Sequence, residues 1–133
     1  MILTARSEIE IEVAFRNLSG KRSEKALLIA SDPMFYGFKE KLVALAAQHS
    51  IPAMYFVREF ALNGGLISYG ASLSATYYQM GAYTGRILKG DKASDLPIVQ
   101  PTRFELVLNL KTARRLQIAV PTSLQVAADE VIE

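Results

Sequence analysis

The chain of 133 residues contains no cysteine and no tryptophan, and His49 is its only histidine. The absence of cysteine excludes disulfides, a thiol nucleophile and thiolate metal sites. His49 stands near the expected end of a helix, where capping or exposure explains it better than catalysis does. Asp91 and Asp95 stand in a polar linker without the glycine of a calcium-binding loop. We therefore expect no metal site and no catalytic residue.

Phosphate-binding and nucleophile motifs are also missing from the sequence. Gly64-Gly65 precedes an apolar run, whereas a phosphate-binding loop follows a strand and opens a helix. Ser31 is followed by Asp32-Pro33, without the small residue and glycine of a nucleophile elbow. The sequence therefore disfavours a dehydrogenase, a nucleotide hydrolase or a serine hydrolase. It predicts a binding protein that is not an enzyme and has no cofactor.

Charge and hydropathy disfavour two further classes of protein. A net charge of +2 is too small for a nucleic-acid binder, and the densest basic group, Lys21, Arg22 and Lys25, is expected at a solvated loop or helix end. The longest apolar runs are far shorter than the ~20 residues that cross a bilayer. Residues 1–6 also lack the pattern of a signal peptide. We expect no nucleic-acid partner and no membrane insertion, and a cytoplasmic location if the chain is complete.

What the sequence does contain is a regular alternation of apolar strands and amphipathic helices. We expect strands at about residues 26–30, 51–56, 66–69 and 104–109, and helices at about residues 7–18, 35–50, 72–89, 111–116 and 122–132. Ser7 and Ser72 fit N-caps, and Gly90 fits the C-terminal stop of the longest helix. Short, continuous apolar runs are typical of strands in parallel sheets. The pattern predicts a single α/β domain over residues 1–133, with an open, mostly parallel, Rossmann-like sheet flanked by helices.

Polar residues follow three of the predicted strands. In open α/β sheets, ligands bind beyond the carboxyl ends of the strands, where loops lead into helix N-termini. The residues at these ends supply a carboxylate for an ammonium group, a guanidinium for a carboxylate, hydroxyls and an aromatic ring. The sequence thus predicts half of a binding site for an amino-acid-like solute, made of Ser31, Asp32, Arg58, Glu59, Tyr69 and Ser72.

Each of these candidate residues also has a simpler interpretation. The serine or aspartate after the first strand would N-cap the helix that follows, and Ser72 would cap the longest helix. Arg58 and Glu59 would form a surface ion pair with each other. Tyr69 would be a core residue. In the same way, Asp129 and Glu130 are expected to carry charge on the outer face of a terminal helix.

A series of segments, taken in order, resembles a known protein family. The long segment 100–113, Gln-Pro-Thr-Arg-Phe-Glu-Leu-Val-Leu-Asn-Leu-Lys-Thr-Ala, is the most specific of them, and the resemblance covers almost the whole chain. The chain resembles the C-terminal portion of ABC transporter substrate-binding proteins that include tryptophan- and tyrosine-binding members. The other matching segments are Ile29-Ala30-Ser31-Asp32-Pro33, residues 51–55 and 58–60, residues 64–70, residues 85–90, Leu96-Pro97 and residues 128–132.

The resemblance implies one lobe of a type I periplasmic binding protein. In that architecture, two Rossmann-like lobes close on a solute and present it to an ABC permease outside the cytoplasm. The resemblance implies that these 133 residues leave out nearly all of the first lobe. By similarity, Ser31, Asp32, Arg58, Glu59 and Tyr69 would line the second-lobe side of the cleft, and the helix at residues 73–89 would cross to pack on the first lobe.

The helix at residues 73–89 is apolar on more than one side. Leu73, Tyr77 and Met80 lie on one side of it, and Ala75 and Tyr78 on another. Without a first lobe this helix leaves apolar surface to cover, and a second copy of the chain would cover it. We expect a homodimer, with exchange of this helix between protomers as one route. The alternative function is a degenerate lobe that acts as a dimerisation or protein-interaction module without a small-molecule ligand.

Overall fold

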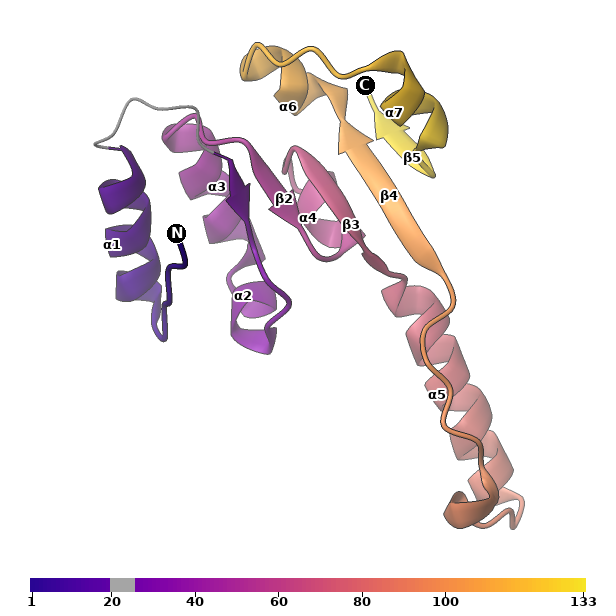
Figure 1. Cartoon of the computed structure of the whole chain (residues 1–133). Helices are drawn as coiled ribbons and strands as arrows, with labels where there is room; N and C mark the ends of the chain where they lie inside the picture. Colours follow the sequence, from indigo (N-terminus) through magenta and orange to yellow (C-terminus); the bar gives the residue numbers. More distant parts are fainter. Residues whose placement is uncertain (20–25) are drawn as a thin grey trace.

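A computed structural model of the chain describes residues 1–19 and 26–133. Within these residues one five-stranded sheet has the order β1-β2-β3-β4-β5 (Figure 1). β1 pairs with β2, β2 with β3 and β4 with β5 in parallel, whereas β3 and β4 are antiparallel. The predicted α/β fold with a mostly parallel sheet is confirmed. The strands are β1 (Leu27–Leu28), β2 (Ala53–Tyr55), β3 (Ile67–Ala71), β4 (Phe104–Asn109) and β5 (Glu130–Ile132).

Seven α-helices and one short 3-10 helix, Ala93–Asp95, connect and flank these strands in the described residues. Ser7 begins the first, because its hydroxyl accepts a hydrogen bond from the Glu10 amide at 3.3 Å. Gly90, with a φ of +109°, follows the end of the longest helix, as predicted. The basic group Lys21, Arg22 and Lys25 lies outside the described residues. The helices are α1 (Glu8–Ser19), α2 (Pro33–Gly37), α3 (Lys39–Gln48), α4 (Arg58–Leu62), α5 (Leu73–Leu88), α6 (Leu110–Arg115) and α7 (Thr122–Ala127).

Three details differ from the predicted elements. The single helix expected at residues 35–50 is divided into α2 and α3, because the backbone of Phe38, with a φ of −99° and a ψ of 21°, leaves helical geometry. The short helix α4 was not predicted. The terminal helix expected to run to Ile132 ends at Ala127, and the residues after it form β5.

The change from α7 to β5 has a local cause at Asp129. Its amide donates to the Leu106 carbonyl at 2.9 Å, and its carboxylate accepts from the Leu106 amide at 2.8 Å. These two bonds hold the chain extended beside β4, where Val131 pairs with Leu108. The prediction that Asp129 and Glu130 lie on the outer face of a terminal helix is therefore wrong.

The hydrophobic core lies between the sheet and the helices near its first strands. Phe15 of α1 and Leu42 of α3 are each 3% exposed. Tyr55 of β2, which is 1% exposed, stacks on Phe60 of α4 with ring centroids 4.7 Å apart. Burial raises the pKa of the Tyr55 phenol, because the phenolate would lose its hydration. The core therefore holds Tyr55 in its neutral form.

An ion pair on the surface also connects α1 with α3. The Lys41 ammonium donates to the Glu8 carboxylate at 2.5 Å and to the Glu12 carboxylate. The hydrogen bond from Lys41 lowers the pKa of Glu12, since it stabilises the ionised carboxylate. The contact helps to align the two helices at their outer side.

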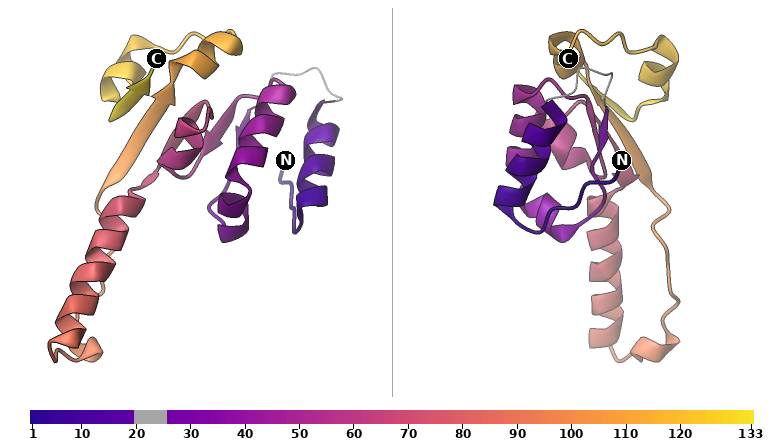
Figure 2. Two further views of the ribbon diagram at one scale, coloured as in Figure 1. Left: turned by 180° about the vertical axis from the view of Figure 1, so that it is seen from behind. Right: turned by 60° about the vertical axis from the view of Figure 1, so that its left-hand side comes forward.

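Helix α5 and the segment that follows it form an arm that projects from the rest of the molecule (Figures 1 and 2). The chain leaves β3, runs outward along α5 and returns through residues 89–103 to enter β4 (Figures 1 and 2). The Tyr83 hydroxyl donates to the Pro97 carbonyl at 2.8 Å and joins the two halves of the arm. Within α5 no residue is buried. The arm therefore presents most of its apolar side chains to solvent in this single chain.

Gly70 occupies a position in β3 that leaves no space for a side chain. A Cβ atom there would lie 1.8 Å from the Phe56 carbonyl oxygen, whereas a Cβ at Gly81 in α5 would have no heavy atom within 4 Å. We predict that Gly70→Ala lowers the free energy of unfolding by about 1–3 kcal/mol or more. Gly81→Ala, the control, raises it by about 0.5–1 kcal/mol through helix propensity. Urea unfolding measures both, and equal changes in the two variants would contradict this account of Gly70.

Candidate functional site

The carboxyl ends of β1, β2 and β3 meet at one edge of the sheet, because these strands run in the same direction. β4 begins at this edge, since Phe104 pairs with Ala71 at the end of β3. We call the residues gathered there the carboxyl edge. It comprises the six predicted residues together with three acidic and basic side chains that were not predicted, in full Ser31, Asp32, Arg58, Glu59, Tyr69, Ser72, Arg103, Glu105 and Glu130.

Arg58 is the centre of an ionic network at the carboxyl edge. Its guanidinium Nη2 donates to the Glu130 carboxylate at 2.5 Å, and Nη1 lies 4.0 Å from Glu105 Oε2. Arg103 approaches the other oxygen of Glu105 at 3.5 Å. Glu105 is 6% exposed, so its charge requires these cationic neighbours. The guanidinium predicted to hold a ligand carboxylate is thus engaged by carboxylates of the protein itself.

Glu59 stands beside Arg58 at the start of α4 but has a different environment. Its Oε2 atom is buried and has no hydrogen-bond partner among the described residues. Arg58 forms ion pairs with Glu105 and Glu130. The surface ion pair between Arg58 and Glu59, one of the two interpretations of the sequence, is therefore not observed. A buried carboxylate oxygen without a donor is costly, and an N–H group from a ligand would satisfy it.

Tyr69 lies on the opposite face of the sheet from this network. Successive residues of a strand face opposite sides, so Ser68 and Gly70 share one face and Tyr69 takes the other. Gly70 pairs with Glu105, which places Glu105 on the face that Tyr69 does not share. The Tyr69 ring, 52% exposed, stacks on Phe104 at 5.9 Å between centroids. Tyr69 is therefore a surface aromatic residue and not a core residue.

The remaining predicted residues act as helix caps or lie on the surface. The Asp32 carboxylate accepts from the Met34 amide at 2.7 Å and so caps α2. The buried Ser72 hydroxyl accepts from the Ala75 amide at 3.4 Å and caps α5. Ser31 is exposed. Both capping interpretations are thus observed, and they leave Asp32 exposed at the edge of the site.

Sequence reasoning missed Glu105 and Glu130, which complete the network. Glu105 stands inside the apolar strand Phe104–Asn109, and a single acidic residue in such a strand could have indicated a buried ion pair. Glu130 was placed on a helix, so its proximity to Arg58 was hidden. With Asp32 and Glu59, the carboxyl edge has four carboxylates against the two guanidiniums of Arg58 and Arg103. The edge favours a cationic group on a ligand.

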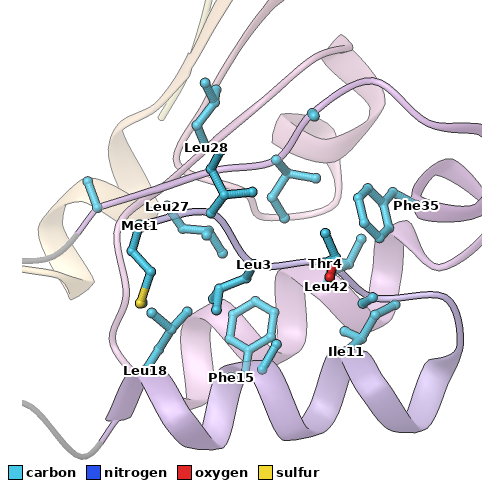
Figure 3. A pocket seen from close by; sticks show the side chains of 16 residues that line it. Met1, Leu3, Thr4, Ile11, Phe15, Leu18, Leu27, Leu28, Phe35 and Leu42 are labelled. Carbon is cyan, nitrogen blue, oxygen red and sulfur yellow. The ribbon is translucent and has the colours of Figure 1, made fainter.

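Two cavities of the described residues are not lined by any of the six predicted residues. One of about 680 Å³ follows β1 (Figure 3), and one of about 670 Å³ lies between α5 and residues 99–103 and has Arg103 of the carboxyl edge in its lining. No group of three or more histidine and acidic side chains in the described part of the chain could hold a metal ion. Across the same residues, no helix combines the length and the apolar character needed to span a bilayer.

The chain is thus an α/β domain whose sheet has a polar, charged carboxyl edge. The family model of the ABC transporter substrate binding proteins matches residues 1–132. The chain belongs to this family, which binds small-molecule solutes for ABC transporters. The confirmed family agrees with the resemblance found in the sequence.

Solved structures show the same fold at low sequence identity. The chain is similar to an ABC domain in complex with L-Trp from Streptococcus pneumonia, with a TM-score of 0.85 and 23% identity over 96% of this chain and 43% of that chain. It is also similar to a conserved domain protein from Vibrio cholerae, with a TM-score of 0.82, 22% identity and the same coverage. A ligand-free, open substrate binding protein with adhesive properties from Clostridium difficile has a TM-score of 0.61 and 18% identity, with 97% and 42% covered.

The similarity covers only part of each of these solved structures. The chain spans less than half the length of each of these solved structures. A search of curated proteins found no match.

The ionic network at Arg58 gives a direct test of the site geometry. We predict that Arg58→Gln lowers the free energy of unfolding by about 1–2 kcal/mol, because it leaves the buried Glu105 carboxylate with one cationic neighbour. Arg103→Gln is the matched control, since Arg103 is 71% exposed and should contribute less than about 1 kcal/mol. Chemical unfolding of both variants measures the difference, and a larger loss from Arg103→Gln would show that the network is not centred on Arg58.

Proposed function

We propose that the chain is one lobe of a solute-binding protein and that its solute is amino-acid-like, with an ammonium group held at the carboxyl edge. The observation that carries this proposal is the buried Glu59 Oε2, which has no partner among the described residues. An ammonium group would donate to it and would be favoured by the excess of carboxylates around it. The exposed Asp32 carboxylate at the neighbouring strand end adds to the same preference.

We propose different roles for the other candidate residues. Arg58 positions the start of α4 through Glu130 and Glu105, so we propose that it supports Glu59 and is not the primary contact for a solute carboxylate. Tyr69 offers an exposed ring on the other face, next to Phe104, and we propose it for an apolar part of the solute or of the opposing lobe. Ser31 and Ser72 border the edge as surface and capping hydroxyls.

The proposal concerns binding and transport, without a chemical step. No group of three or more histidine and acidic side chains that could hold a metal ion accompanies the carboxyl edge in the described residues. We propose that the chain is not an enzyme and that the whole protein to which such a lobe belongs delivers its solute to an ABC permease outside the cytoplasm. The structure with L-Trp makes aromatic amino acids the first solutes to test.

We predict weak binding of L-tryptophan or a related amino acid, with a Kd on the order of millimolar, because one lobe buries only one side of the solute. Isothermal titration calorimetry should show that tryptamine, which keeps the ammonium group, retains binding, whereas indole-3-propionate, which lacks it, does not. Glu59→Gln should weaken binding at least about tenfold, since it removes the charge that attracts the ammonium group.

The matched control is Glu40→Gln, because Glu40 is an exposed carboxylate on α3, away from the carboxyl edge. This variant should bind as the parent chain does. Preferential binding of indole-3-propionate, or equal effects of the two glutamate variants, would contradict a role for Glu59 in holding an ammonium group.

The alternative function, a dimerisation or protein-interaction module, is favoured by one specific observation. α5 exposes large apolar side chains, at 67% for Tyr77, 81% for Tyr78, 56% for Met80 and 82% for Leu88. Several large apolar side chains exposed on one helix are typical of an interaction site. We propose that a second copy covers the arm and that the chain is a homodimer, with exchange of α5 as one route.

Sedimentation at micromolar concentration tests the homodimer. We predict a dimer for the parent chain and a monomer for the double variant Tyr78→Lys and Leu88→Lys, because the charges would be buried without partners in the interface. Ile9→Lys, at a side chain that is 71% exposed on α1, is the control and should remain dimeric. A parent chain that sediments as a monomer would refute this proposal without affecting the solute site.

A further inference from the structure

Asn63 and Gly64 form the one asparagine–glycine pair of the sequence. The other two asparagines, Asn17 and Asn109, are each followed by leucine. The main-chain nitrogen that follows an asparagine can attack its side-chain carbonyl carbon, and glycine favours this attack because it has no Cβ atom to hinder the approach. Asn63 is exposed, whereas Asn109 is buried. Residue 63 therefore combines a reactive neighbour with access to water.

The structure places this pair in the turn that ends α4. Asn63 is the C-cap of α4, and its side-chain Nδ2 donates to the Glu59 carbonyl at 2.8 Å. The Gly64 amide donates to the Ala61 carbonyl at 3.0 Å, and the φ of Gly64 is +99°. The two groups that would react, the Gly64 amide nitrogen and the Asn63 side-chain amide, are thus both hydrogen-bonded in the closed turn. They become free to react when the turn opens.

The chain is anchored on both sides of the turn, so that its opening is local. Phe60, before the turn, is 0% exposed. Gly65, after the turn, is buried, and its amide donates to the Phe60 carbonyl at 2.8 Å. Residues 62–64, between these anchors, are exposed or half-buried. Segments with few buried contacts open far more often than the whole domain unfolds, so the turn can open while the core stays folded.

We propose that Asn63 is a site of spontaneous deamidation, which proceeds through a succinimide when the turn opens and which releases the end of α4. The Gly64 amide nitrogen forms a bond to Cγ of Asn63 and loses its proton, and the side-chain nitrogen leaves with that proton as ammonia. Water then opens the five-membered ring. Hydrolysis at Cγ gives aspartate, and hydrolysis at the main-chain carbonyl carbon gives isoaspartate. One water is consumed and one ammonia is released, without oxidation or reduction.

Both products remove a hydrogen bond that holds the end of α4. A carboxylate at residue 63 has no N–H group to donate to the Glu59 carbonyl, and its negative charge is unfavourable at the C-terminal end of a helix. Isoaspartate also adds a carbon atom to the main chain, which displaces the Gly64 amide from the Ala61 carbonyl. Because α4 begins with Arg58 and Glu59, the modification loosens the helix that carries them. The proposal goes beyond the solute site and does not depend on it.

The test incubates the full chain in mildly alkaline buffer and follows it by peptide mapping with mass spectrometry. We expect residue 63 to convert at least about tenfold faster than Asn17, an exposed asparagine that is followed by leucine. In water enriched in heavy oxygen the product should take up one labelled oxygen atom, and aspartate and isoaspartate should both form. Urea should accelerate conversion at residue 63 by at least about tenfold, since unfolding breaks the hydrogen bonds of the turn.

Three variants separate the chemistry from its effect. Asn63→Gln should convert no faster than Asn17, because its longer side chain would have to close a six-membered ring. Asn63→Asp reproduces one product, and amide hydrogen exchange by NMR should be at least about tenfold faster at Gly64 and Gly65 than in the parent chain, while amides of β3 stay protected. Asn17→Asp is the matched control for the added charge and should leave exchange at Gly64 and Gly65 unchanged.

Equal conversion at residues 17 and 63 of the folded chain would overturn the proposal, and so would conversion that occurs only in urea. A rate at residue 63 that urea leaves unchanged would show that opening of the turn does not control the reaction. Unchanged exchange at Gly64 and Gly65 in Asn63→Asp would contradict the release of the end of α4.

Discussion

The antiparallel pairing of β3 with β4 is the constraint on which the rest of the structure depends. The chain leaves the sheet after β3, forms the α5 arm and returns in the opposite direction, so that Ala71 pairs with Phe104 and Ile67 with Leu108. This register sets Glu105 opposite Gly70, at the carboxyl edge. β5 then aligns with β4 and brings Glu130 to the same place. The ionic network at Arg58 exists only because these two returning strands begin where the three parallel strands end.

Electrostatics at the carboxyl edge follow from this arrangement. The buried Glu105 carboxylate requires cationic neighbours, and these are the guanidiniums of Arg58 and Arg103. Both guanidiniums are therefore paired with a carboxylate of the protein itself. Glu59 and Asp32 are not part of that ionic network, and the Glu59 Oε2 atom is buried. The carboxyl edge therefore has two carboxylates, those of Glu59 and Asp32, that no guanidinium neutralises. An ammonium group finds a better electrostatic environment there than a carboxylate does.

Elements with strong local signals were predictable from the sequence. α5 has a capping serine at its start and Gly90 after its end, and the boundaries of β4 agree with the observed strand. Short elements were not predictable: α4 has five residues, too few to show a helical period, and β5 has three residues whose conformation is decided by pairing with β4. The apolar residues near the C-terminus fit either a helix or a strand until that pairing is known.

The shared edge of the candidate site was predictable from the sequence, but the faces and partners of its side chains were not. The positions of Asp32, Arg58 and Tyr69 at one edge follow from strand direction alone, because the carboxyl ends of parallel strands meet. The face of the sheet that each side chain occupies depends on register, so the separation of Tyr69 from Glu105 could not be derived from the sequence. The partners of Arg58 were hidden for the same reason, since Glu130 lies 72 residues further along the chain.

The central claim is that this lobe binds its solute at the carboxyl edge, and NMR chemical-shift mapping with L-tryptophan tests it most directly. The account predicts shift changes that saturate and that gather at Asp32, Arg58, Glu59 and residues 69–72. Changes confined to the cavity that follows β1 or to the α5 arm, or no change at saturating millimolar concentrations of each amino acid tested, would contradict it.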